Sequence, residues 1–201
     1  MEWLIFAYSL PPEPSGKRVA VWRKLRRLGA VYSNEGLWFM PRIGKSEDEI
    51  QRVAKDVQRD GGSAISFVAS EMDEEQAERL RANFLRARAS EYQDLERECN
   101  KLISHIEREI ERENFQFREI EGLEEDLRKL EHWFGQIRSR DVLDSPEREL
   151  VAGLLTECRG LTERFTALVY KESKPLSKRP GARNGAVNAP ERPRVISTGE
   201  D

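Results

Sequence analysis

The sequence predicts an α+β protein: a ferredoxin-like βαββαβ domain, an antiparallel three-helix coiled-coil bundle and a disordered basic tail. Three observations predict this organisation. Short apolar runs alternate with helical patterns in residues 1–72, apolar residues recur every three or four positions in residues 73–172, and periodicity is absent from residues 173–201. These three ranges are the expected domains and tail.

The chain opens with a strand, a helix and a hairpin. Trp3 to Leu10 is a dense apolar run typical of a buried strand, and the prolines that follow end it. Ser15 is expected to cap a helix over Lys17 to Leu28. Val31 to Ser33 and Leu37 to Met40 then predict two strands joined by a short loop.

A second helix and a fourth strand complete the N-terminal domain. Ser46 and Glu49 have the spacing of a capping box, so a helix is expected to start there. Ala64 to Ser70 predicts the last strand. The order βαββαβ is that of a ferredoxin-like domain, with two helices on one face of a four-stranded sheet.

Three further helices are predicted from apolar spacings of three and four. Asp73 and Gln76 suit the start of the first, while Ser145 as cap and Pro146 as first helical residue suit the start of the third. Short loops between such helices indicate an up-down-up coiled-coil bundle. The expected seams are Tyr92, Leu95, Cys99, Leu102 and Ile106; Ile120, Leu123, Leu127, Leu130, Phe134 and Ile137; and Val151, Leu154, Cys158, Leu161, Phe165 and Leu168.

The composition disfavours several classes of protein. No apolar run is long enough for a membrane span and the start lacks a basic signal-peptide region, so we expect a cytoplasmic protein. Cys99 and Cys158 form no CxxC pair, and both are expected to pack in the bundle. With only two histidines, the chain offers little for a metal or nucleophilic site, so no enzyme activity, metal or cofactor is expected.

One helix concentrates positive charge. The chain has a net charge of −3, yet "GKRVAVWRKLRRLGA", Gly16 to Ala30, holds six cations and no acid. One interpretation is an ordinary solvated amphipathic helix. The other is a surface for nucleic acid or phosphate, which a cluster of one sign favours. The candidate contact residues are Arg18, Arg23, Lys24, Arg26 and Arg27.

The first forty residues resemble the N-terminal domain of the ChrB family, regulators found with bacterial chromate-resistance transporters. The matching residues are Leu10-Pro11, Pro14-Ser15, Arg18-Val19, Val21-Trp22-Arg23, Arg27-Leu28-Gly29-Ala30, Gly36, Trp38 and Pro41. The resemblance implies a homodimeric DNA-binding transcriptional regulator linked to chromate resistance, with the arginine-rich helix among its contacts to double-stranded DNA. ChrB proteins continue into a second domain associated with the chromate response. Here the sequence has only the tail at that place, which leaves chromate open as an effector.

Two other classes of function remain as alternatives. A non-enzymatic, dimeric interaction or scaffold protein would use the same basic helix to bind an acidic protein partner. A metal-dependent nuclease is disfavoured. The strand–helix opening resembles that of the small CRISPR adaptation nucleases, but those carry an aspartate at the end of the first strand, where this chain has Ser9.

Overall fold

The computed structural model describes residues 1–33 and 36–173; the tail predicted from residue 173 onward lies, except for Ser173, outside the described residues. Within the described residues the protein is mixed α/β, with a four-stranded antiparallel sheet and five helices. Its elements, in order, are β1 (Trp3–Ser9), α1 (Ser15–Leu28), β2 (Val31–Tyr32), β3 (Trp38–Pro41), α2 (Ser46–Arg59), β4 (Ser63–Ala69), α3 (Glu74–Glu111), α4 (Phe117–Arg140) and α5 (Glu147–Glu172).

The sheet has the strand order β2-β3-β1-β4, and every neighbouring pair is antiparallel. The central strand β1 places Ile5 opposite Phe39 of β3 and opposite Phe67 of β4. Because side chains alternate along a strand, β1 contributes to both faces of the sheet. Trp3 and Ile5 lie in one apolar core, while Leu4 and Phe6 lie in another.

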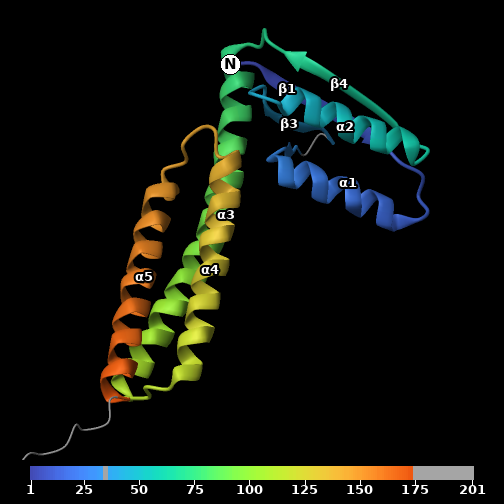
Figure 1. Ribbon diagram of the computed structural model, residues 1–201. Coiled ribbons are helices and arrows are strands. Elements are labelled where there is room, and N and C mark those ends of the chain that lie inside the picture. The colour runs from blue at the N-terminus through green and yellow to red at the C-terminus, as the bar shows by residue number, and fades with distance from the viewer. Residues whose placement is uncertain (34–35, 174–201) are drawn as a thin grey trace, which may run out of the picture.

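Helices α1 and α2 lie together on one face of the sheet (Figure 1). Val21 and Leu25 of α1 are buried there, as are the apolar residues of α2 that recur at helical spacing. The residues that fill this core are Leu4, Phe6, Val21, Leu25, Ala30, Trp38, Met40, Ile50, Val53 and Val57. Burial of one stripe of α1 leaves its charged side chains on the remaining surface.

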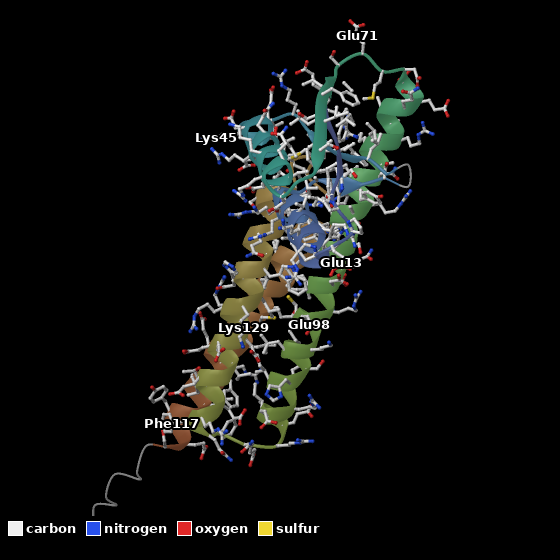
Figure 2. The ribbon with its side chains drawn as sticks, turned by 90° about the vertical axis from the view of Figure 1, so that its right-hand side faces the viewer. Glu13, Lys45, Glu71, Glu98, Phe117 and Lys129 are labelled. Atoms are coloured by element: carbon white, nitrogen blue, oxygen red, sulfur yellow. The ribbon has the colours of Figure 1, made fainter. Side chains whose placement is uncertain are left out.

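The first turns of α3 cover part of the opposite face of the sheet. Phe84 of α3 lies edge-on to Trp3, with ring centroids 6.1 Å apart, and Trp3 in turn lies edge-on to Phe39 at 5.8 Å. After these turns α3 continues without interruption into the bundle (Figure 1). Glu71, just before α3, and Phe117, at the start of α4, therefore lie near opposite ends of the molecule (Figure 2).

Helices α3, α4 and α5 pack side by side around a continuous apolar core. The seams predicted on α3 and α4 are largely buried, although Leu127 and Phe134 are only half-buried. On α5 the fully buried row is Val151, Leu155, Cys158, Thr162, Phe165 and Val169. The helix is thus rotated so that Leu154, Leu161 and Leu168 of the predicted seam lie at the margin of the core. None of the described helices combines the length and apolarity of a membrane span.

Three of the four residues predicted to cap a helix do not occupy the capping position in the structure. Asp73 does cap α3, since its carboxylate accepts a hydrogen bond of 2.8 Å from the Gln76 N–H. In contrast, α1 already begins at Ser15, and Ser46 lies inside α2, where its hydroxyl accepts from the Ile43 N–H at 3.0 Å. Pro146 precedes the first residue of α5. A side chain that can cap a helix is not compelled to do so when a nearby N–H competes for it.

Candidate functional site

The basic helix α1 is held in place by its apolar stripe and by its ends. Gly29 adopts a left-handed conformation with φ of 87°, and its N–H donates to the Arg26 carbonyl, which ends the helix. An added Cβ at Gly29 would lie 2.7 Å from the Cβ of Arg140, so α1 approaches α4 closely at this point. Arg26 and Arg27 occupy the last turn, where positive charge interacts favourably with the negative end of the helix dipole.

Two of the six cations of α1 face acidic residues near the end of α2. Lys24 donates a hydrogen bond to the carboxylate of Asp56 and forms an ion pair with it. That hydrogen bond lowers the pKa of Asp56 below its ordinary value. Lys17 lies 3.5 Å from the carboxylate of Asp60 and 3.3 Å from its backbone carbonyl. The charge of both lysines is thus partly neutralised within the protein.

Arg26 faces the bundle instead. Its guanidinium lies 3.9 Å from the carboxylate of Glu91 on α3 and 5.6 Å from the centre of the Trp22 ring. The Arg26 side chain is consequently half-buried, and its charge is shared between an anion and an aromatic face. Arg26 belongs to the contact between α1 and the bundle as well as to the surface of α1.

The remaining three arginines form what we call the basic face: Arg23 and Arg27, one turn apart on one side of α1, and Arg18, near the start of the helix and about half a turn around it from Arg27. All three are exposed, and none has a carboxylate within 4.0 Å among the residues that the structure describes. Arg18 donates to the Pro11 carbonyl at 3.4 Å, and Arg27 donates to the Arg23 carbonyl at 3.4 Å. A guanidinium held this way keeps other N–H donors for an anion such as phosphate.

Behind Arg26 lies a junction cluster of charged side chains: Arg26, Arg88, Glu91 and Arg140. Arg140 at the end of α4 contacts Glu91 through Nε at 3.0 Å, and Arg88 Nη2 lies 3.1 Å from the same carboxylate. Arg88 is fully buried, and burial lowers its pKa. Three guanidiniums therefore surround one carboxylate where α1, α3 and α4 meet.

The sequence analysis did not identify the junction cluster. A signal exists in the spacing: Phe84, Arg88 and Tyr92 follow one another at intervals of four and continue the apolar seam of α3 toward the sheet. A charged residue at a seam position is expected to be buried and paired. The nearby Asp141, also buried, accepts a hydrogen bond of 3.1 Å from Tyr92. Burial, together with this carboxylate, raises the pKa of the Tyr92 phenol.

These features define a mixed α/β protein that carries a basic helix beside the junction of a small sheet and a helical bundle. Residues 18–176 match the family described as "Protein ChrB, N-terminal", so the chain belongs to the ChrB N-terminal family. It is 29% identical over 90 residues to a protein of Cupriavidus metallidurans named "Protein ChrB". That match covers 45% of this chain but only 27% of the relative, so the matched stretch spans about a quarter of that protein's length. No solved structure matches.

Proposed function

We propose that this protein is a DNA-binding transcriptional regulator linked to chromate resistance, and that it contacts double-stranded DNA through α1. Membership of the ChrB N-terminal family supports a regulator connected with chromate resistance. The observation that supports α1 as the contact is the basic face, because Arg18, Arg23 and Arg27 are each exposed without a carboxylate partner among the described residues. Guanidinium groups bind phosphate with two parallel hydrogen bonds and remain charged at physiological pH.

The same proposal gives the remaining parts a role. We regard the sheet with α1 and α2 as a ferredoxin-like DNA-binding domain and α3 to α5 as a coiled-coil bundle that joins two copies into a homodimer in the cytoplasm. The strand order β2-β3-β1-β4 with two helices on one face supports the first assignment. The heptad-like seams of the bundle support the second. The chain needs no catalytic group for this function.

The test is binding to duplex DNA from upstream of its own reading frame at several salt concentrations. If the basic face neutralises phosphates, the logarithm of the affinity falls linearly with the logarithm of the salt concentration. The double variant Arg23→Ala/Arg27→Ala should bind more weakly, and its slope should be flatter by about one unit per lost contact. Repeating the titration with chromate tests whether this chain responds to it.

A matched control is Arg118→Ala/Arg128→Ala, which removes two exposed arginines from α4 on the acidic bundle. It lowers the net charge equally but should leave the slope unchanged. Equal slopes for the wild type and the α1 double variant would reject α1 as the DNA contact. The alternative, in which α1 binds an acidic protein, would then be favoured.

A further inference from the structure

A cleft lies beside the basic face, between the start of α1 and the edge of the sheet. Its volume is about 380 Å³, within the range of small-ligand sites, and we call it the aromatic cleft. The side chains that matter here are Tyr8, Arg18, Trp22, Tyr32 and Trp38. They come from β1, α1, β2 and β3, so four elements contribute to one hollow.

Two of these aromatic side chains are exposed to solvent, yet each also contacts another side chain of the protein. Trp22 is 47% exposed and Tyr32 is 55% exposed. The Tyr32 ring lies 5.2 Å from the ring of buried Trp38, and the Trp22 ring lies beside the Arg26 guanidinium. Large aromatic rings that are held in place yet open to solvent offer a flat partner a surface for stacking.

Arg18 supplies the charge of the cleft. It precedes Trp22 by one helical turn, so the two side chains share one face of α1. Arg18 is the one positively charged side chain among the described residues that line the cleft. None of those described residues carries a carboxylate. Burial raises the pKa of Tyr8, so its phenol keeps its proton and can donate a hydrogen bond. The cleft thus combines flat apolar surfaces with donors for an anion.

We propose that the aromatic cleft binds one unpaired nucleotide of a DNA strand, with the base against Trp22 and Tyr32 and its phosphate on Arg18. This inference rests on the proposed function, since it takes DNA as the polymer held by the basic face. Arg26 lies one helical turn beyond Trp22 on the same side of α1, so a strand that leaves the cleft along the helix meets further positive charge. Stacking needs only the flat face of a base, so the site accepts bases without strong sequence preference.

The test uses a duplex with a single 2-aminopurine bulge, the same duplex fully paired, and the free 2-aminopurine mononucleotide. We expect the wild type to bind the bulged duplex about 5- to 150-fold more tightly than the paired duplex, the range measured for base–aromatic stacking. Binding should also quench 2-aminopurine fluorescence, because the base stacks on an indole or a phenol. The mononucleotide should bind much more weakly than the bulged strand.

Single substitutions locate the effect. Trp22→Ala and Tyr32→Ala should lose both the preference for the bulge and the quenching while keeping the affinity for paired duplex. Arg18→Ala should weaken binding of the bulged duplex. The matched control is Tyr170→Ala, which removes a 57% exposed aromatic ring at the far end of α5 and should change nothing. Thermal unfolding establishes that each variant is folded.

The possible failures are distinguishable. If neither duplex binds, the proposed function is wrong, and this inference falls with it. If both duplexes bind equally without quenching, DNA binding stands and the inference about the cleft is overturned. If the mononucleotide binds as tightly as the bulged strand, the cleft is a site for free nucleotides and the assignment to a DNA strand is wrong.

Discussion

Arg26 on α1 and Glu91 on α3 lie with Nη2 and Oε1 3.9 Å apart, and this contact joins the basic helix to the bundle. Glu91 also accepts from Arg140 of α4 and lies 3.1 Å from buried Arg88. One carboxylate therefore holds three helices together. The Glu91 side chain is only 12% exposed, so water competes little for its contacts with the guanidinium groups.

Glu91→Gln should strongly destabilise the fold. The substitution leaves Arg88 buried without the carboxylate beside it, and removal of one member of a buried ion pair costs about 3–5 kcal/mol. Denaturant unfolding measures the loss. Glu107→Gln, at an exposed position of the same helix, is the control and should be close to neutral.

Arg88→Met should restore much of that stability in the Glu91→Gln background. Methionine fills a similar length of apolar space without a charge, so the penalty of an unpaired buried guanidinium disappears. If the double variant is no more stable than Glu91→Gln alone, the cost does not arise from the buried charge of Arg88.

The bundle core should distinguish two residues of the predicted seams. Ile106 is fully buried, so Ile106→Ala should lower the free energy of unfolding by about 2–5 kcal/mol. Leu127 is only half-buried, so Leu127→Ala should cost clearly less. Both values come from chemical denaturation, and an equal loss for the two variants would contradict the difference in burial between Ile106 and Leu127.

Asp56→Asn should tighten binding to duplex DNA. The substitution frees Lys24 from its carboxylate partner and removes a negative charge next to α1. Salt titrations should show a steeper slope than that of the wild type. Glu107→Gln, at an exposed position of α3 sixteen residues beyond Glu91, makes the same change of net charge and should leave the slope unaltered. Weaker binding by Asp56→Asn would argue against Lys24 and its neighbours as a phosphate surface.

The contact between Lys24 and Asp56 should also give a small pH dependence of stability. The pKa of Asp56 is lowered in the folded protein, chiefly by the Lys24 hydrogen bond. A lowered carboxyl pKa adds stability above the unfolded pKa, and this contribution is lost as pH falls through the folded value. The stability difference between wild type and Asp56→Asn should therefore be present at neutral pH and shrink in acid. A difference that is independent of pH would mean that the ion pair contributes nothing.

Cys99 and Cys158 should not react with a thiol reagent in the native protein. They are buried on facing helices, and the Cys158 thiol donates to the Cys99 carbonyl at 3.6 Å. The side-chain contact with Cys158, together with burial, raises the pKa of Cys99, which suppresses the reactive thiolate. A colorimetric thiol assay should count both groups after denaturation and neither before it. Rapid modification of the folded protein would show that the bundle opens at this layer.

The sequence predicted the four strands and five helices that the structure contains, because the strands are compact apolar runs and the helices have apolar residues at helical spacing. The rotation of α5 was missed because Leu154 and Leu155 are both apolar, and either gives spacings of three and four. The buried row passes through Thr162, whose hydroxyl bonds to the Cys158 carbonyl at 2.8 Å, and a polar residue conceals that row in a hydrophobicity pattern.

Only the concentration of positive charge at the candidate site could be predicted from the sequence. The run of arginines in α1 is visible in the sequence, but the division of its cations among Asp56, Glu91 and solvent is not. Those partners lie on other helices, and tertiary packing brings them to α1. The aromatic cleft was hidden for the same reason, since Tyr8, Trp22 and Tyr32 come from separate elements.

Helix α3 links the sheet to the bundle as one continuous helix. Its 38 residues correspond to about 57 Å at 1.5 Å per residue, and the helix both covers part of the sheet and belongs to the bundle. With no break along that length, a tilt of about 5° at the bundle end displaces the sheet end by roughly 5 Å, as follows from the same helix length. A change in bundle packing that tilted α3 would therefore move the sheet relative to the far end of the bundle.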